Sequence, residues 1–262
     1  MEISVVIPTY RPGIYLFECL NSVINQDYPH DNFEIIIVLN GDKYPYFTEI
    51  ELFIQDKKTQ FQLIYSQQKG VSNARNIALD NTSSTYIVFL DDDDILSSNY
   101  LSLLYSDISY DSITVSDVKT FFNDLSMLED DYISKCYHKC KNGKKYSLFK
   151  YRSFLSSSCA KMIPRSIIDN FRFDKNLNYG EDGVFMFAIS CNIRDVRLAN
   201  ENAIYYRRMR SGSVSRTTLS LMARIRILML KLFTFSFVYL KAINRYNLLL
   251  FLSRIAAAIK SL

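Results

Sequence analysis

The stretch YIVFLDDDDIL, residues 86–96, runs an apolar strand pattern directly into four consecutive carboxylates, Asp91–Asp94. Charges of one sign this close together repel each other, so a surface loop would gain nothing from collecting them. If the chain stays extended after Leu90, Asp91 and Asp93 point to the same side. Two carboxylates on one side suit a hard divalent cation that also binds phosphate oxygens, and the charge of that cation would offset the repulsion. The stretch therefore predicts a metal site.

The alternative is an acidic surface turn, in which Asp94 caps a helix over residues 97–104. An Asp in this position accepts a hydrogen bond from a backbone N–H of the first helical turn. Capping by Asp94 is compatible with a metal site made by the other three carboxylates, and we expect both.

Strand and helix patterns alternate through the first half of the chain. The strand patterns are ISVVIP (3–8), FEIIIVLNGD (33–42, ending in a turn), FQLIYS (61–66) and YIVFL (86–90), and helical spacing is found at 15–26, 45–56 and 72–79. Short apolar runs between helices are typical of a parallel sheet that is covered on both faces. The predicted fold class is therefore α/β. Residues 106–161 are less regular, and only one strand, over 113–118, is predicted there.

Polar residues follow these strands where each of them ends. Pro8, Thr9 and Tyr10 come after the first strand, Asn40 closes the second, and the carboxylate run follows the fourth. In an open parallel sheet, ligands bind beyond the carboxyl ends of the strands. We therefore expect these residues to form one site.

The segment GVSNARNIAL, residues 70–79, adds a basic residue to this site. Gly70 permits an unusual turn, and Ser72 or Asn73 is expected to cap the helix that follows. Arg75 then lies in the first helical turn, where a guanidinium beside a helix N-terminus suits a diphosphate. The alternative is an ordinary surface arginine.

The segment NYGEDGVFMFAIS, residues 178–190, places Glu181 and Asp182 before an apolar helix. One interpretation is capping of this helix by Asp182, which the helix dipole favours. The other is a general base, with one carboxylate structural and the other catalytic. The spacing alone does not separate these two interpretations.

The charge of the chain is divided unevenly. The net charge is +4, but eleven Lys and Arg and no Asp or Glu occur from Asn202 onward, so the preceding part is acidic. Five cysteines lack the spacing of a disulfide framework, and no second ligand pair accompanies the CYHKC segment (136–140), so reduced thiols are expected rather than zinc. Together with the absence of a signal-peptide pattern at the N-terminus, this predicts a cytoplasmic protein. Nucleic acid is not expected as a partner, because the body is acidic.

The C-terminal segment is basic and rich in aromatic and aliphatic residues. On a helix, Arg224, Lys231, Lys241 and Arg245 would share one face, and the longest uncharged stretch, 232–240, is too short to span a membrane. This pattern predicts binding at the inner surface of the cell membrane. The alternatives are a helical subdomain packed on the body, or a homodimer contact.

Five segments in this order resemble family 2 glycosyltransferases, which are inverting enzymes of the GT-A fold. The segments are VVIPTY, EIIIV followed by a turn, GVSNARNIAL, FLDDDD and GED followed by an apolar helix, and the resemblance spans roughly residues 3–216. It implies a catalytic domain over 1–216 with a mostly parallel central sheet, followed by a basic amphipathic helical extension over 217–262.

The resemblance also implies roles for the residues noted above. The DXD element would be Asp91–Asp93, in which Asp91 and Asp92 also face the donor and Asp93 is the first expected ligand to Mn²⁺ or Mg²⁺, together with Asp91. Pro8, Thr9 and Tyr10 would line the nucleotide pocket. Arg75 would bind the nucleotide diphosphate, and Asp182 would be the catalytic base.

Two positions depart from the family pattern. Many members carry an acidic pair after the second strand, whereas this chain has Leu39 and Asn40, and Asn40 would accept a hydrogen bond from the base. Some members supply a metal-binding His in the segment that corresponds to residues 205–216, where this chain has no His. Arg210 takes that place and would bind a phosphate.

The predicted function is transfer of a sugar from a nucleotide-diphosphate donor, UDP first, to a saccharide or lipid-linked saccharide in bacterial-type surface polysaccharide synthesis. The alternatives are a non-catalytic membrane-associated module that binds sugar nucleotides and a nucleotidyltransferase. The glycine-rich loop expected of the latter is absent from ISVVIPTYRPG.

Overall fold

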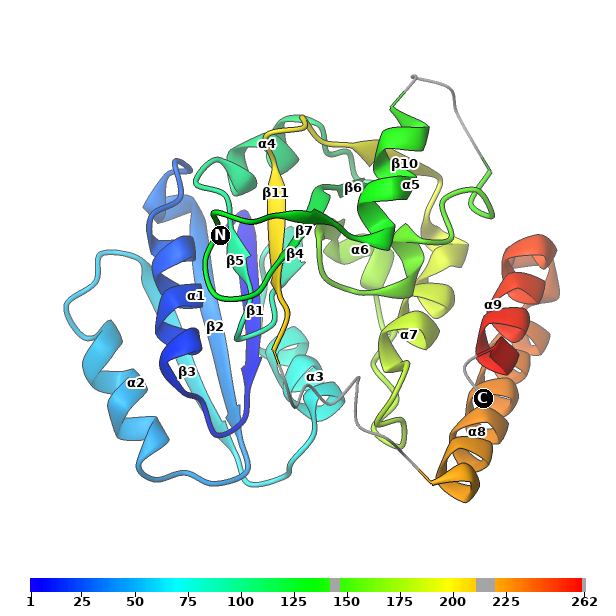
Figure 1. The fold of residues 1–262 in the computed structure, drawn as a ribbon, viewed down its shortest axis with the longest axis horizontal. Coiled ribbons are helices and arrows are strands. Elements are labelled where there is room, and N and C mark those ends of the chain that lie inside the picture. The colour runs from blue at the N-terminus through cyan, green and yellow to red at the C-terminus, as the bar shows by residue number, and fades with distance from the viewer. Residues whose placement is uncertain (142–146, 211–219, 261–262) are drawn as a thin grey trace.

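The structure is a computed structural model that describes residues 1–141, 147–210 and 220–260 (Figure 1). The predicted boundary between residues 216 and 217 lies outside these ranges. The described chain forms a central sheet between two layers of helices, with a pair of C-terminal helices beyond one of these layers.

The central sheet has seven strands in the order β10-β6-β9-β4-β1-β2-β3. Their bounds are β1 Ile3–Thr9, β2 Phe33–Asn40, β3 Gln60–Ser66, β4 Tyr86–Phe89, β6 Ser112–Val115, β9 Lys161–Pro164 and β10 Asp195–Leu198. Only β9 runs antiparallel to its neighbours β4 and β6. The four N-terminal strands coincide with the predicted ones, and β1, β2 and β4 are buried throughout, as expected for a sheet covered on both faces.

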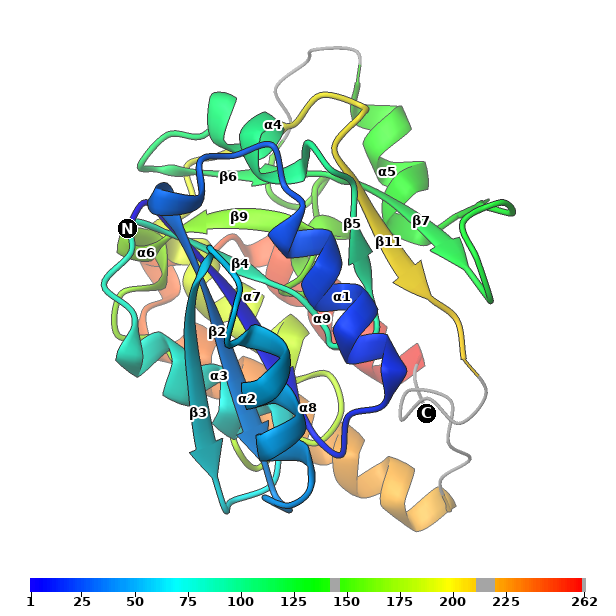
Figure 2. The ribbon, with the colours of Figure 1, turned by 90° about the vertical axis from the view of Figure 1, so that its left-hand side faces the viewer.

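Helices cover both faces of this sheet. The helices of the main body are α1 Ile14–Ile24, α2 Tyr46–Ile54, α3 Val71–Asn81, α4 Tyr100–Ser106, α5 Tyr132–Cys140, α6 Arg165–Ile168 and α7 Glu181–Ile189. Figure 2 shows α1 and α2 in front of the sheet and α7 behind it. The carboxyl ends of β1, β2 and β4 stay uncovered between these layers, which leaves room for a site.

A second, smaller sheet has the order β5-β11-β7-β8. Its strands are β5 Ile95–Leu96, β7 Asp117–Phe121, β8 Glu129–Asp130 and β11 Ile204–Arg208. The single strand predicted over 113–118 is therefore wrong, because the chain leaves the central sheet at Ser116 and continues in this one. Neither α5 nor β9 was predicted. Polar and apolar residues are mixed in the α5 segment, and the apolar run of β9 begins with a buried lysine.

The carboxylate run is a turn and not an extended segment, because Asp94 N donates to Asp91 O at 3.2 Å. Asp94 caps no helix: α4 begins at Tyr100 and is preceded by Asn99. The buried Asp94 carboxylate instead accepts hydrogen bonds from Tyr205 Oη at 2.6 Å and Arg208 N at 2.7 Å. Both the extended geometry and the cap predicted from sequence are thus wrong, and Asp94 ties the turn to β11.

The C-terminal helices α8 (Leu221–Lys241) and α9 (Leu248–Lys260) pack on the body through α7. The Phe187 ring lies 5.5 Å from Phe235 and 5.1 Å from Tyr246, measured between ring centroids, and Tyr246 Oη donates to Ala188 O at 3.0 Å. For this face the structure thus agrees with the alternative of a helical subdomain packed on the body. Among the described helices, none is both long and apolar enough to cross a membrane.

The basic residues of this segment do not share one face, contrary to the prediction. Arg245 lies beyond the end of α8 and donates to Asn192 Oδ1 at 2.8 Å. Lys231 lies over Gly180, where an added Cβ would come within 2.6 Å of Lys231 Cε. Gly180 also has a left-handed φ of 77°.

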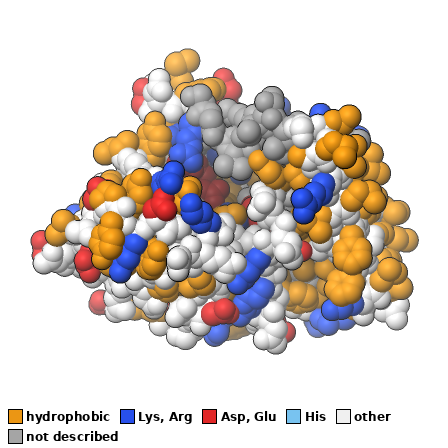
Figure 3. All heavy atoms as spheres, turned by 90° about the horizontal axis from the view of Figure 1, so that it is seen from below, with side chains coloured by type: hydrophobic (Ala, Val, Ile, Leu, Met, Phe, Trp, Pro, Cys, Tyr) orange, Lys and Arg blue, Asp and Glu red, His pale blue; other side chains and the backbone are white. Residues whose placement is uncertain are grey.

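The outward face of α8 is mainly apolar. Its exposed side chains include Met222, Met229, Phe233, Phe237 and Leu240 (Figure 3, right-hand side).

Candidate active site

A cavity of about 720 Å³ opens at the carboxyl ends of the strands and contains every site residue that the sequence predicted. These residues are Pro8, Thr9, Tyr10, Asn40, Arg75, Asp91, Asp92, Asp93, Asp182 and Arg210. Figure 3 shows acidic side chains within a hollow and basic ones around it. The topology explains this convergence, since β1, β2 and β4 are parallel neighbours whose carboxyl ends meet at one edge.

Each carboxylate of the turn has a different partner. Asp91 Oδ1 pairs with Arg75 Nη2 at 2.8 Å, Asp93 Oδ2 pairs with Arg210 Nε at 2.7 Å, and Asp92 accepts a hydrogen bond from Thr9. Burial raises the pKa of Asp92 to about 6. Burial and the charge of Asp91 also raise the pKa of Asp93. The neighbouring arginines therefore do not fully offset the negative charge of the turn.

The turn fits a hard divalent cation that is shared with a ligand. No group of three or more His, Cys, Asp or Glu side chains that could hold a metal occurs in the described ranges. Asp91 and Asp93 offer carboxylate oxygens, and Mg²⁺ is commonly bound by one or two carboxylates while phosphate oxygens and water complete its shell. Burial is the main cause of the raised pKa values of Asp92 and Asp93, and repulsion from the neighbouring carboxylates adds to it; a cation would offset that repulsion. The donor set thus suits a cation that binds together with a diphosphate.

Arg75 is a buried arginine that bonds two carboxylates, and not a surface arginine. Its Nη1 bonds Asp182 Oδ1 at 2.7 Å, and its Nη2 bonds Asp91 Oδ1 at 2.8 Å. The guanidinium also lies 5.3 Å from the centre of the Phe173 ring. Both terminal nitrogens thus already bond carboxylates, so Arg75 ties the carboxylate turn to the start of α7.

The start of α3 differs from the prediction. Gly70, with a φ of 124°, precedes the helix, and no side chain caps it, so the caps predicted at Ser72 and Asn73 are wrong. Asn73 Nδ2 donates instead to Ser66 Oγ at 3.1 Å, while the Ser72 hydroxyl is buried without a hydrogen-bond partner among the described residues. Both residues line the cavity, but neither caps the helix.

Asn40 and Tyr10 lie at the same end of the cavity. Asn40 is buried, donating to Thr9 O at 2.7 Å and accepting from Gly70 N at 2.9 Å, so it joins β1, β2 and the α3 turn. The Tyr10 ring is 42% exposed and has Lys69 Nζ 5.2 Å from its centre. An exposed ring at a cavity wall is suited to stacking on a planar ligand.

The two oxygens of Asp182 differ in their contacts. Oδ1 accepts from Arg75 at 2.7 Å and from Ser158 Oγ at 2.9 Å, whereas the one hydrogen bond of Oδ2 within the described ranges is a long one of 3.4 Å from Ser157 Oγ. Capping is not its role, because α7 begins at Glu181 and is preceded by Gly180 without a side-chain cap. Asp182 therefore presents one restrained and one nearly free carboxylate oxygen to the cavity.

The carboxylate next to Asp182, that of Glu181, has a raised pKa. Burial and the neighbouring Asp182 raise the pKa of Glu181 to about 7. Its Oε1 lies 3.6 Å from Arg75 Nη1, farther away than Asp182 Oδ1. The adjacent carboxylates thus divide into Asp182, whose Oδ1 pairs with an arginine, and Glu181, which shares a proton with solvent near neutral pH.

The sequence analysis missed the serines that contact Asp182. Ser157 and Ser158 come from the segment before β9 and lie 25 and 24 positions, respectively, from Asp182 along the chain. A run of serines carries no specific pattern, so nothing in the local sequence links it to an acid in a later helix. The antiparallel strand β9, which was also missed, creates that proximity.

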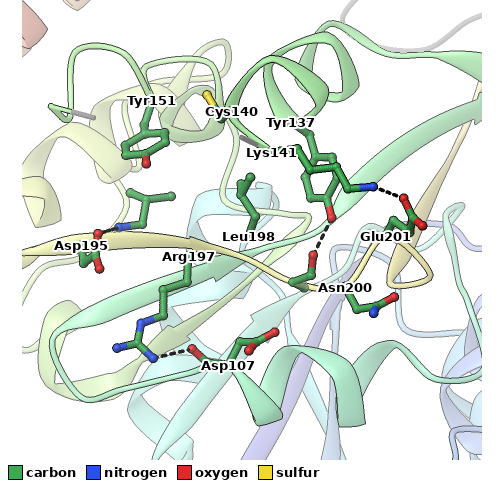
Figure 4. A pocket seen from close by; sticks show the side chains of 12 residues that line it. Asp107, Tyr137, Cys140, Lys141, Tyr151, Asp195, Arg197, Leu198, Asn200 and Glu201 are labelled. Carbon is green, nitrogen blue, oxygen red and sulfur yellow. Dashed lines mark hydrogen bonds and ion pairs between the residues drawn. The ribbon is translucent and has the colours of Figure 1, made fainter. Parts of the chain in front are cut away.

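A second cavity, of about 510 Å³, lies between α5 and β10 (Figure 4). Its polar groups largely bond one another: Lys141 pairs with Glu201, Tyr137 donates to Ala199 O, and Arg197 donates to Asp107 O. This cavity contains none of the carboxylates at the strand ends. The first cavity is therefore the candidate active site.

Known proteins share this sequence pattern. The family model described as glycosyl transferase family 2 matches residues 4–172. The chain is 30% identical over 229 residues to glycosyltransferase GlyA of Streptococcus pneumoniae, covering 82% of this chain and 32% of GlyA. It is 28% identical over 228 residues to minor teichoic acid biosynthesis protein GgaB of Bacillus subtilis, covering 83% of this chain and 24% of GgaB. The chain thus spans about a third or less of the length of these relatives.

The fold is similar to a solved structure as well. Residues 1–349 of TarS from Staphylococcus aureus, in complex with UDP-GlcNAc, superpose with a TM-score of 0.76 at 18% sequence identity. The match covers 100% of this chain and 72% of the TarS chain. At this identity the likeness shows the fold alone, and it confirms the fold class that the sequence predicted.

Proposed function

The chain belongs to glycosyltransferase family 2, and on that premise we propose that it moves a sugar from a nucleotide-diphosphate donor to a saccharide hydroxyl with inversion. The observation that carries the proposal is the unequal bonding of Asp182. Its Oδ1 is fixed by two donors and its Oδ2 is nearly free, in the cavity that also contains the carboxylate turn. A base and a diphosphate site in one cavity are what this transfer requires.

In the reaction, the acceptor oxygen attacks the anomeric carbon from the face opposite the diphosphate. The bond between that carbon and the phosphate oxygen breaks, its electron pair stays on the diphosphate, and Asp182 Oδ2 takes the acceptor proton. Arg75 restrains the Asp182 carboxylate by donating to Oδ1 at 2.7 Å. Arg75 therefore contacts the catalytic base, Asp182. Binding of the diphosphate, which the sequence predicted for Arg75, is proposed for Arg210 instead.

Arg210 and the carboxylate turn are proposed to hold the leaving group. Asp91 and Asp93 would bind Mn²⁺ or Mg²⁺, which when bound stabilises the negative charge that develops on the diphosphate. Arg210 now pairs with Asp93 at 2.7 Å, so its guanidinium already lies beside the place where that charge develops. Some family members have a metal-binding His in the segment that corresponds to residues 205–216. Arg210 takes that place here, so the site has a positively charged side chain where those members have a metal ligand.

UDP is the nucleotide that we propose, with a hexosyl or N-acetylhexosaminyl group as the sugar. Two observations support it: the exposed Tyr10 ring at the cavity wall, which suits stacking on a base, and the complex of the TarS structure with UDP-GlcNAc. The Asn40 amide instead holds the backbone of the cavity wall, since it bonds Gly70 N and Thr9 O. The acceptor is proposed to be a saccharide or a lipid-linked saccharide of a surface polymer, because the name of GgaB places it in minor teichoic acid biosynthesis.

The experiment that tests this function is turnover of UDP-sugars with a mixture of saccharide and lipid-linked acceptors. Release of UDP that depends on the acceptor is expected. UDP-sugar binding without release, over the whole acceptor panel, would favour the non-catalytic module instead.

We further propose that the protein attaches to the cytoplasmic surface of the cell membrane through the outer face of α8. Met222, Met229, Phe233, Phe237 and Leu240 are exposed there, and α8 also exposes Arg224, Arg226 and Lys241 and contains no acidic residue. Apolar side chains that enter the headgroup region beside cations that attract anionic lipid are typical of interfacial helices. We propose this segment, over 217–262, as an extension that packs on a catalytic domain over 1–216.

Replacing Phe233 and Phe237 by Ser is expected to lower binding to anionic vesicles several-fold, because both rings lie on the outer face. Leu52→Ser, on the exposed face of α2, is the matched control and should bind as the wild type. High salt should release part of the wild-type protein, since the attraction is screened. Equal binding to neutral and anionic vesicles, unaffected by salt or by these substitutions, would contradict the proposal. Loss of a solution dimer in the double variant would assign this face to a second copy of the chain.

A further inference from the structure

Lys161, the first residue of β9, is a buried lysine that the proposed mechanism does not use. Its side chain is 1% exposed, and Nζ donates to Ser157 O at 2.5 Å and to Cys159 O. Across the described ranges it forms no ion pair with a carboxylate. Burial lowers its pKa to about 8.

A lysine in this place is costly, because its charge is removed from water without a carboxylate partner. Packing alone does not account for it, since Met would fill a similar volume without that cost. What Lys161 adds is two hydrogen bonds to the preceding loop. These two hydrogen bonds, made by a lysine that is costly to bury, therefore indicate that residues 157–160 must be held in one conformation.

This loop is tightly constrained. Ala160 has a φ of 61°, in the left-handed region that residues other than glycine seldom adopt. Cys159 N donates to Ser157 Oγ at 3.1 Å, and Ser116 N donates to Ala160 O at 3.1 Å. Such conformations persist where the surrounding contacts over-determine them, and they cluster at functional sites.

The loop presents Ser158 to the base. Ser158 is fully buried, and its Oγ donates to Asp182 Oδ1 at 2.9 Å, beside the Arg75 bond to the same oxygen. Two donors on one oxygen fix the rotation of the carboxylate. The other oxygen, Oδ2, is then left toward the cavity to receive a proton.

We propose that Ser158, held in place by the two backbone hydrogen bonds of Lys161, is a positioning residue that orients Asp182 for proton abstraction. This inference rests on the proposed role of Asp182 as the base. Neither residue touches the substrates in this account, since Ser158 acts through Asp182 and Lys161 acts through Ser158. Loss of either should therefore slow turnover without changing donor binding.

Ser158→Ala is expected to lower kcat by about tenfold to a hundredfold, the range for a hydrogen bond to a charged group, while KM for the donor stays within about twofold. Ser158→Thr keeps the hydroxyl and should recover most of that loss. Ser156→Ala is the matched control, since its hydroxyl bonds Ser153 O and Tyr132 Oη and not Asp182. It should leave both constants within about twofold of the wild type.

Lys161→Met should lower kcat to a similar extent. The double variant with Ser158→Ala should be no slower than Ser158→Ala alone, because both residues act through one hydrogen bond. If Lys161→Met does not fold, the three serine variants decide the question. A kcat within twofold of the wild type in folded Ser158→Ala, or an equal loss in Ser156→Ala, would overturn the inference. The proposed function fails separately, if the wild-type protein releases no UDP with any acceptor of the panel.

Discussion

Replacing Asp182 by Asn is expected to lower turnover by roughly a hundredfold or more, the usual contribution of a general base, while affinity for the donor stays within about twofold. The amide is isosteric with the carboxylate, and its oxygen can still accept from Arg75 and Ser158. Its NH₂ group then takes the place of Oδ2, where it cannot receive a proton. The loss should therefore appear in kcat and not in the binding of UDP.

Glu181→Gln is the informative companion to this variant. Glu181 is the adjacent carboxylate, and burial together with Asp182 raises its pKa to about 7. If Asp182→Asn remained active while Glu181→Gln lost turnover, the base would be Glu181. Thermal unfolding of both proteins separates a loss of chemistry from a loss of fold, because Arg75 keeps Asp91 as a partner in either variant.

Asp93→Ala is expected to abolish the part of UDP binding that depends on Mn²⁺ and to leave the fold intact. The substitution removes a proposed ligand, and it also relieves the repulsion from Asp91 that contributes to the raised pKa of Asp93. The fold loses only the pair with Arg210, which is half exposed. Asp91→Ala should have the same effect more weakly.

Calorimetry of UDP binding with and without Mn²⁺ measures this effect. Asp80→Ala, which removes an exposed carboxylate paired with Arg172 far from the cavity, is the control and should bind as the wild type. GDP and CDP in the same titration test the choice of base. Tight Mn²⁺-dependent binding of UDP to Asp93→Ala would contradict the proposed metal ligand.

The sequence predicted which residues come together at one cavity, because these residues follow parallel strands. Thr9, Asn40 and Asp91 are far apart along the chain, yet each follows or closes a buried apolar run, and the sheet brings such ends together. The apolar runs themselves were clear, since a strand that is buried on both faces has no polar alternation to confuse with a loop.

The predictions that failed concern side chains whose partners are distant in sequence. Asp94 precedes a helical pattern and so resembles a cap, but Tyr205 and Arg208 bind it from more than a hundred residues away. The strand β9 was not predicted because it begins with Lys161, and a lysine among apolar residues normally indicates an exposed position. These pairings depend on tertiary contacts, and no local pattern in the sequence encodes them.

The C-terminal helices show a similar limit. Helical spacing placed Arg245 on the same face as Lys231, whereas the chain leaves the helix after Lys241. The packing of Phe235 against Phe187 turns one face of α8 inward and leaves an apolar face outside. Composition predicted both an apolar and a basic character, but only the packing determines which side chains are exposed.

The most direct test of the account is the configuration of the product at the anomeric carbon, read by NMR from a wild-type reaction with an α-linked UDP-sugar. Attack opposite the diphosphate, with Asp182 Oδ2 as the base, predicts a β-linked product and one UDP released for each glycoside formed. An α-linked product would contradict the account, because it requires either two successive displacements or attack from the same face as the leaving diphosphate.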